Sequence, residues 1–314
     1  MPVSRREFIA VSSSTLAAMP LAAWTGQTQA PPTTHFEAVR RNVGYFTARG
    51  GTIGWLSNKD ALLVVDSQYP DTAALFLGAL EQKTTRGIDV LFNTHHHADH
   101  TGGNGILKPK TKRIVAQTKV PDLQKRAAAQ QAQTQPNAAQ TPQVVADATF
   151  DKTWGVDAGD EKVTARHYGP GHTGGDAIIQ FEHAHIVHMG DLFWNEIHPF
   201  VDRPFGASIQ NWMKTIETVS KAMPADTTYI AGHARAGQPV VVDRAALLRQ
   251  RDYFDAVLTY ARKGIADGKS RDEIAKLDNL SGFESYQSLP PRATLAFVLG
   301  VAYDEVTNKS VESR

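Results

Sequence analysis

Four histidines and one aspartate lie within six consecutive residues, in the run His95-His96-His97-Ala98-Asp99-His100. An apolar stretch, residues 90–93, precedes this run and is typical of a strand. Alternating residues of an extended turn project the same way, so His95 and His97 can meet one metal ion. Asp99 and His100 then open the next helix and can point at a second ion. The pattern therefore predicts a metal site at the end of a strand.

The other counts limit what this site can be. The 314 residues include twelve histidines and no cysteine, which excludes a thiolate zinc site, an iron–sulfur cluster, a disulfide framework and a cysteine nucleophile. Any metal must therefore be held by imidazole and carboxylate. The 33 basic and 32 acidic residues give a net charge of +1, which offers no electrostatic footprint for nucleic acid. We expect a small-molecule substrate and no nucleic-acid partner.

Three further candidate ligands follow other expected strands. His172 lies in a glycine-dense loop after residues 163–167, Asp191 follows residues 186–189, and His233 follows residues 228–231. In each case a strand pattern leads through one or more glycines to an imidazole or a carboxylate. Each residue alone is typical of an ordinary loop, but the three in this order indicate one shared site.

The chain alternates short apolar runs with amphipathic stretches, which is typical of an α/β fold. Strands are expected at residues 52–57, 61–66, 90–93, 113–116, 163–167, 178–181, 186–189 and 228–231, and helices at 69–83 and 208–222. Residues 124–143, rich in Gln and Ala, predict a helix that continues into a polar loop, either a flap over a site or a solvated insertion. After Pro239 the strand patterns end, and helices are expected at 245–263, after a capping box at 270–273, and at 291–306.

These motifs closely resemble the metallo-β-lactamase superfamily over residues 44–240. The resemblance implies a four-layer αββα sandwich for residues 31–240, with residues 241–314 as a helical extension packed on the core. It implies two metal ions, zinc by default, although iron or manganese occur in relatives. The implied ligands are His95, His97 and His172 for one ion, Asp99, His100 and His233 for the other, and Asp191 as the bridge.

The resemblance also implies hydrolysis by a metal-bridging hydroxide, which Asp99 would orient and deprotonate. Zinc β-lactamases of the best-known kind carry a cysteine at the position of Asp191 and a lysine at that of Trp194, so this recognition device is missing here. The expected substrate is a small ester, lactone, amide or β-lactam. Trp194 and His198 follow the bridging residue closely and are predicted to contact the substrate.

Three alternatives remain beside this interpretation: a β-lactamase proper, a mononuclear iron enzyme similar to sulfur dioxygenases, and a non-catalytic periplasmic metal-binding accessory protein. Metal analysis and substrate panels separate them. Thr94, Thr173 and Asp176 are predicted to fix the imidazole tautomers. His96 is predicted to point away from the metals, since its neighbours on both sides point in.

The N-terminus resembles a bacterial twin-arginine export signal. Ser4, Arg5, Arg6 and Phe8 match its motif, while Ala10 stands where a lysine is common. An apolar stretch follows that is too short and serine-rich to span a bilayer comfortably. Residues 1–30 are therefore expected to be a signal peptide recognised by the twin-arginine translocation machinery, and the mature protein to be periplasmic or otherwise exported.

Overall fold

The computed structural model describes residues 33–135 and 143–308, and the first half of this part forms a seven-stranded sheet in the order β1 to β7. Strands β1 to β4 pair antiparallel with their neighbours, whereas β4, β5, β6 and β7 run parallel. The carboxyl ends of these parallel strands therefore lie at one edge of the sheet. The strands are β1 (His35–Arg40), β2 (Val43–Thr47), β3 (Ile53–Ser57), β4 (Leu62–Val65), β5 (Ile88–Asn93), β6 (Thr111–Gln117) and β7 (Ala148–Phe150).

A second sheet of six strands has the order β15-β13-β11-β10-β9-β8. Its pairs are antiparallel except for β11 and β13, which run parallel. A separate two-stranded ribbon pairs β12 with β14. The strands are β8 (Thr153–Ala158), β9 (Glu161–Arg166), β10 (Ile178–Phe181), β11 (Ile186–His188), β12 (Trp194–Asn195), β13 (Thr228–Ile230), β14 (His233–Ala234) and β15 (Val241–Val242).

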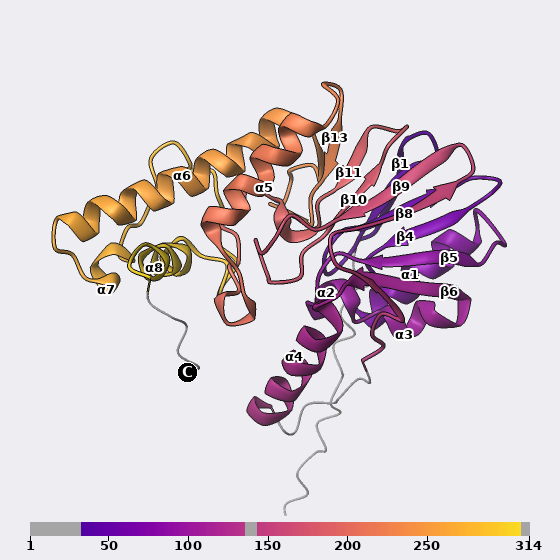
Figure 1. The fold of residues 1–314 in the computed structure, drawn as a ribbon, viewed down its shortest axis with the longest axis horizontal. Coiled ribbons are helices and arrows are strands. Elements are labelled where there is room, and N and C mark those ends of the chain that lie inside the picture. The colour runs from indigo at the N-terminus through magenta and orange to yellow at the C-terminus, as the bar shows by residue number, and fades with distance from the viewer. Residues whose placement is uncertain (1–32, 136–142, 309–314) are drawn as a thin grey trace, which may run out of the picture. The chain divides into compact units, whose positions relative to one another are not determined.

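Helices lie outside both sheets, and the helix of residues 120–134 projects away from them (Figure 1). The helices are α1 (Pro70–Glu81), α2 (Ala98–Thr101), α3 (Asn104–Leu107), α4 (Val120–Thr134), α5 (Ile209–Ala222), α6 (Arg244–Ala266), α7 (Arg271–Ile274) and α8 (Leu295–Val306). Short 3-10 turns lie at η1 (Lys108–Lys110), η2 (Gly190–Leu192) and η3 (Arg203–Phe205). Helices α1 and α3 lie with the first sheet, and α5, α6 and α8 lie on the side of the second sheet.

Three buried clusters demonstrate the four layers. One cluster contains side chains of both sheets, among them Val65 and Ile179, and so lies between them. A second joins the first sheet to α1, with Val64 packed in the same cluster as Phe76. The third and largest joins the second sheet to the C-terminal helices through residues such as Val187, Trp212, Phe254 and Val298. The predicted αββα sandwich with a helical C-terminal region is confirmed.

Most expected elements are present, with boundaries shifted by up to four residues. Strand patterns were expected to end at Pro239, but β15 follows it and pairs with β13, so the second sheet extends to Val242. The helix expected from residue 291 begins only at Leu295, where Thr294 accepts a hydrogen bond from Phe297 N as the N-cap. The capping box at Ser270 and Glu273 is confirmed. Strands β1, β2, β7, β8, β12 and β14 were not predicted.

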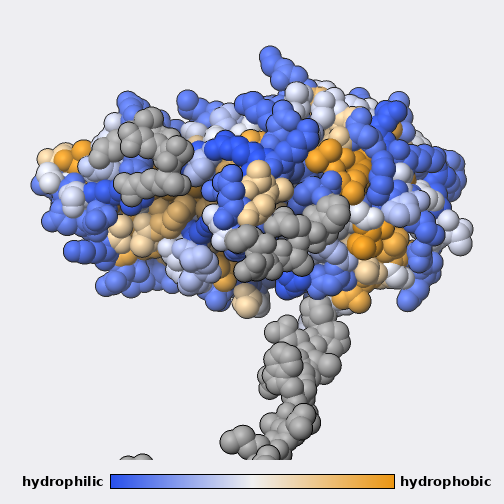
Figure 2. All heavy atoms as spheres, turned by 90° about the horizontal axis from the view of Figure 1, so that it is seen from below, coloured by the Kyte–Doolittle hydropathy of each residue, from blue (hydrophilic) through white to orange (hydrophobic). Residues whose placement is uncertain are grey.

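The predicted signal peptide, residues 1–30, lies outside the described residues, as does 136–142 within the Gln/Ala-rich segment. The first part of that segment belongs to α4. Within residues 33–135 and 143–308, no helix combines the length and the apolar character that a membrane crossing requires. Figure 2 shows a face on which hydrophilic residues are interspersed with small apolar patches.

Candidate metal centre

Strand ends bring the seven predicted ligands together. The run after β5 carries two histidines in its extended turn and two further ligands in α2, and His97 itself is the N-cap of α2. The others lie in the loop between β9 and β10, in η2 after β11, and on β14 after β13. They form two groups that share one carboxylate: His95, His97, His172 and Asp191 in the first cluster, and Asp99, His100, His233 and Asp191 in the second.

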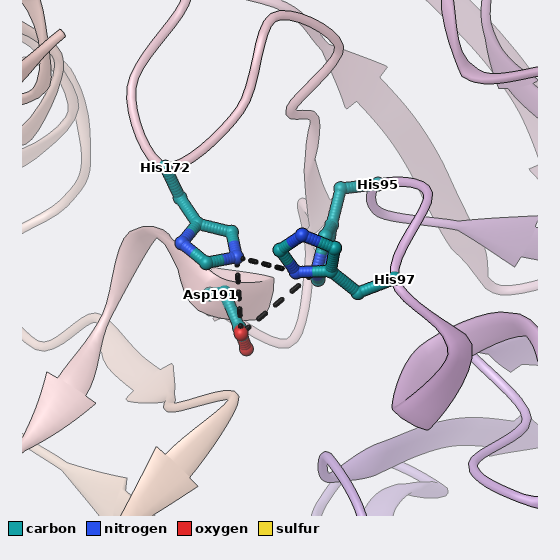
Figure 3. A group of neighbouring side chains, drawn as sticks. All are labelled: His95, His97, His172 and Asp191. Carbon is teal, nitrogen blue, oxygen red and sulfur yellow. Dashed lines mark hydrogen bonds and ion pairs between the residues drawn. The ribbon is translucent and has the colours of Figure 1, made fainter. Parts of the chain in front are cut away.

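In the first cluster, three imidazoles and a carboxylate converge on one point (Figure 3). His172 Nε2 lies 2.9 Å from His97 Nδ1 and 3.3 Å from Asp191 Oδ2. His95 Nε2 lies 3.8 Å from the same carboxylate oxygen. Ligands about 2 Å from a tetrahedral zinc ion lie about 3–3.5 Å from one another. These separations therefore match a set of ligands around one ion.

The second cluster uses the other oxygen of the same carboxylate. His100 Nε2 lies 2.9 Å from Asp191 Oδ1, and His233 Nε2 lies 3.4 Å from it. His233 Nε2 is also 3.1 Å from Asp99 Oδ2. Because one oxygen of Asp191 faces each cluster, this side chain has the geometry of a bridge between two neighbouring cations.

Buried hydrogen bonds hold two of the imidazoles from behind. Asp66, fully buried at the end of β4, lies 2.7 Å from His100 Nδ1 and accepts hydrogen bonds from the amide and hydroxyl of Thr94. The hydroxyl of Thr94 lies 3.0 Å from His95 Nδ1. Partners of this kind orient a ligand ring and select the tautomer that leaves its other nitrogen free for a metal. The predicted role of Thr94 agrees with these contacts.

The loop after β12 holds the other two imidazoles of the first cluster. Asp202 Oδ2 lies 2.8 Å from His97 Nε2, so Nδ1 of this ring faces the cluster. The carbonyl oxygen of Phe200 lies 2.7 Å from His172 Nδ1, which leaves Nε2 of that ring facing inward. Each of four imidazoles thus presents one nitrogen to a cluster and contacts the protein with the other: His95, His97, His100 and His172.

The charges at the site favour a cation. Burial lowers the pKa of His172 to about 4, so this ring is neutral at pH 7. Burial would also lower the pKa of His233, but Asp191 and Asp99 outweigh burial and raise it to about 9. A proton on His233 therefore balances part of the negative charge of the two carboxylates. A divalent ion in the second cluster would take over this role.

The residues present fit a pair of metal ions. His95 Nε2 is buried and has no hydrogen-bond partner, and an unsatisfied buried polar atom is costly. It points into the first cluster, where a metal would satisfy it. Imidazole and carboxylate are ligands that suit zinc, iron and manganese, so the donor set does not by itself select one of these metals.

His96 lies outside both clusters, as predicted. Its ring stacks on Phe205 with centroids 4.7 Å apart, and neither ring nitrogen has a hydrogen-bond partner. Its Nε2 lies 3.8 Å from Asp202 Oδ2, which makes a third, smaller group with His97. Since His97 Nε2 already contacts Asp202 at 2.8 Å, we interpret this group as part of the support of His97.

The two predicted substrate contacts have different surroundings. Trp194 pairs with His233 across the β12–β14 ribbon, and its ring lies 4.4 Å from that imidazole, so it forms a wall of the second cluster. His198 is buried, and its Nδ1 lies 2.8 Å from the hydroxyl of Tyr253 on α6. Burial lowers the pKa of His198 to about 4. Its described contacts thus belong to the packing of the C-terminal helices, and a substrate contact stays a prediction.

The sequence analysis missed the carboxylates that hold ligand imidazoles from distant segments of the chain. Asp66 and Asp202 were not singled out, although Asp66 directly follows the apolar strand β4, which was a usable signal. Thr173 and Asp176 were predicted to fix imidazole tautomers, and this is corrected. Asp176 accepts hydrogen bonds from the amides of Gly171 and Thr173 and from the Thr173 hydroxyl, so it shapes the backbone of the loop that carries the ligand.

Comparisons with solved structures show the same fold. A stereoselective inverting sec-alkylsulfatase from Pseudomonas sp. matches with a TM-score of 0.65 at 17% identity, covering 86% of this chain and 50% of its own. A metallo-beta-lactamase from Pontibacter korlensis gives 0.55 at 15% identity, covering 71% and 99%. The DIM-1 metallo-beta-lactamase gives 0.57 at 18% identity, covering 71% and 98%.

The alkylsulfatase match covers more of this chain than the two β-lactamase matches do. The alkylsulfatase match includes more residues than segment 1–240 contains, so it extends into the C-terminal helical region. The chain spans half the length of that alkylsulfatase. No curated protein sequence matches the chain significantly. The profile of the Metallo-beta-lactamase superfamily matches residues 46–233, which is more than half of the chain and includes all seven clustered ligands. The chain therefore belongs to the metallo-beta-lactamase superfamily.

Proposed function

We propose that this chain is an exported dinuclear zinc hydrolase that cleaves a small ester, lactone, amide or β-lactam. The observation that carries the proposal is the position of Asp191, whose two carboxylate oxygens face two separate sets of ligands. A mononuclear iron enzyme would need only His95, His97 and His172. The second set, with Asp99 held beside His233, favours two ions.

A pair of zinc ions in such a site supplies a nucleophilic water at neutral pH and stabilises negative charge on the substrate. The chain's own residues orient the water and accept its proton. Asp99 is the most accessible carboxylate of the centre, with a side chain 23% exposed against 2% for Asp191. Its Oδ2 lies 3.1 Å from His233 Nε2 at the accessible side of the second cluster, a position suited to orient a water and accept its proton.

The side chains that line the metal centre limit which substrates it can bind. Trp194 offers an aromatic face beside His233, where the best-known zinc β-lactamases carry a lysine. A β-lactamase proper is therefore the less favoured alternative. Sulfate esters are a second candidate class, because the fold similarity to a sec-alkylsulfatase extends into the C-terminal helices and the β-lactamase matches cover less of the chain.

Metal content and substrate turnover test the proposal together. Purified mature protein is expected to hold two zinc ions per chain and to hydrolyse at least one member of a panel of esters, lactones, amides, β-lactams and sulfate esters. One iron per chain with consumption of oxygen would favour the mononuclear alternative. A zinc-replete protein without turnover on the whole panel would favour a non-catalytic accessory protein.

Single substitutions test the site. His97→Ala and Asp99→Asn are each expected to abolish hydrolysis while the far-UV circular dichroism spectrum is retained. His183→Ala is the matched control, since His183 is exposed and its Nδ1 lies 2.9 Å from Asp160 O and 4.0 Å from Glu161 Oε1, at the hairpin between β8 and β9. Hydrolysis that persists in His97→Ala or Asp99→Asn at the wild-type rate would contradict the assignment.

The proposal of export depends on the motif at Arg5 and Arg6. Replacement of both by lysine keeps the charge but removes the guanidinium pair. In a bacterial host with a twin-arginine system, we expect the wild-type protein in the periplasmic fraction and the double variant in the cytoplasm. Equal periplasmic amounts of the two proteins would refute the export signal.

A further inference from the structure

The loop of residues 200–208, here called the bracing loop, supports the first cluster at several points. Its Phe200 carbonyl and Asp202 carboxylate contact the outward nitrogens of His172 and His97. The amide of Asp202 also donates to His172 O at 3.1 Å, and the amide of Ser208 donates to Gly171 O at 2.9 Å. The positions of two first-cluster imidazoles thus depend on the conformation of this loop.

Glu305 on α8 holds the second half of the bracing loop and the start of α5. Its carboxylate accepts hydrogen bonds from Ser208 Oγ at 2.9 Å and from the amides of Ile209 and Gln210 at 2.9 and 3.0 Å. It also lies 3.5 Å from the guanidinium of Arg203, directly after Asp202. A carboxylate at the start of a helix is stabilised both by the free amides and by the helix dipole.

The surroundings of Glu305 favour a fixed geometry. Its side chain is only 8% exposed, and charge-assisted hydrogen bonds of this kind are among the strong ones. A second contact from α8 reaches the other end of the loop, where the ring of Phe297 packs on that of Phe200 with centroids 5.5 Å apart. Helix α8 therefore contacts the bracing loop at both ends, on either side of Asp202.

We propose that Glu305 is a positioning residue for the first metal cluster. It acts through the bracing loop, which sets the orientation of His97 and His172. This inference rests on the proposed dinuclear site. It also gives the C-terminal helical region a function at the metal centre, beyond covering the second sheet.

The second cluster is supported by other segments, which makes the proposal specific. Its His100 is held by Asp66 at the end of β4, and its His233 lies on β14. Loss of the Glu305 contacts should therefore weaken the first metal more than the second. A general loss of stability would instead affect both metals alike.

The role of Glu305 is tested by measuring zinc affinity rather than enzymatic activity. Metal-free protein is titrated with zinc against a chromophoric chelator, which yields two stepwise dissociation constants for the wild type. Asp202→Asn identifies the constant of the first cluster, and His233→Gln, which changes a ligand of the second cluster alone, identifies that of the second. Mutation of a residue that hydrogen-bonds a metal-bound histidine typically lowers metal affinity by about 10–100-fold. Glu305 is one contact further from the metal, so Glu305→Gln is expected to raise the dissociation constant of the first cluster by about 3–10-fold.

Glu217→Gln is the matched control. Glu217 lies on α5, which Glu305 also contacts, and its carboxylate is 3.4 Å from Arg251 on α6, so it joins two neighbouring helices without contacting the bracing loop. Both constants should stay as in the wild type. If Glu305→Gln does not fold, Ser208→Ala is the substitute. It removes one of the three hydrogen bonds to Glu305, together with the N-cap contact from Asn211 N, and should raise the dissociation constant of the first cluster by a smaller factor.

The outcomes separate the two proposals. A wild-type protein that takes up fewer than two zinc ions overturns the dinuclear site and this inference with it. Two zinc ions in the wild type, with a first constant unchanged in Glu305→Gln or in its substitute Ser208→Ala, overturn the inference alone. Equal weakening of both constants also overturns it, because that result indicates a purely structural role.

Discussion

Asp66→Asn should weaken zinc binding through the tautomer of His100. Asp66 has φ +64°, a left-handed conformation that asparagine adopts readily, so the backbone tolerates the exchange. The carboxylate oxygen Oδ2 accepts from the Thr94 hydroxyl and lies 2.7 Å from His100 Nδ1, while Oδ1 accepts from the Thr94 amide. If the side-chain oxygen of the new asparagine still accepts the hydrogen bond from the Thr94 backbone amide, its NH2 group faces His100.

The consequence follows from hydrogen-bond directions. A donating NH2 group favours the tautomer in which His100 Nδ1 accepts, and the proton then moves to Nε2, the nitrogen that faces Asp191. A protonated Nε2 cannot bind a metal. The expected loss is about 10–100-fold in affinity at the second cluster, or about 1.4–2.7 kcal/mol.

Chelator-competition titration with zinc near pH 7.5 measures this loss. Asp60→Asn is the control, because Asp60 is on the surface and pairs with Lys59. The control should leave both zinc constants unchanged. Asp66→Asn should raise the dissociation constant of the second cluster most, because it contacts His100 directly and His95 of the first cluster only through Thr94. If Asp66→Asn binds two zinc ions as tightly as the wild type, the tautomer argument is refuted.

Three further changes test the fold and the site. Gly232→Ala would place a methyl group in overlap with Asp191 Oδ1, so zinc binding measured by the same titration should be lost, and retained binding would contradict the bridge geometry. A methyl group at Gly78, an exposed position of α1, meets no atom within 4 Å, so Gly78→Ala should raise the free energy of unfolding in urea by about 0.5–1 kcal/mol; a decrease would speak against the helix. Burial would raise the pKa of Asp89, but hydrogen bonds from Arg86 and Lys112 lower it to about 2. The ionised carboxylate therefore stabilises the folded protein above about pH 4, and this contribution is lost as the pH falls towards 2. Asp89→Asn should therefore cost about 1–2 kcal/mol in urea unfolding at pH 7, allowing for partial exposure, and much less near pH 2, whereas an equal cost at both pH values would exclude this linkage.

Most of the ligands could be predicted from sequence because they closely follow a strand signal, whereas His172 lies further along, in the glycine-dense loop after β9. The apolar run of β5 ends at the histidines, and the same arrangement precedes Asp191 and His233. Local pattern is sufficient in these cases, since parallel neighbours deliver their carboxyl ends to one edge of a sheet.

Supports of the ligands were missed because they depend on contacts between distant segments. Asp66 is 34 residues from His100, and Asp202 is 105 residues from His97. No local pattern predicts such a pairing. The missed strand β8 had a usable local signal, because Trp154, Val156 and Ala158 alternate with more polar positions, the period-2 pattern of a half-buried strand.

The difference between the anchor at Asp66 and the anchors in the bracing loop has a mechanical consequence. Asp66 belongs to the first sheet, whose strands β4 and β5 pair in parallel along a continuous ladder, so the anchor of His100 is part of a rigid element. The anchors of His97 and His172 lie in a loop that depends on α8 for its hold at both ends. Elements with fewer ladder hydrogen bonds open more readily. Changes in the C-terminal helices should therefore reach the first metal before the second, although all seven ligands lie outside those helices.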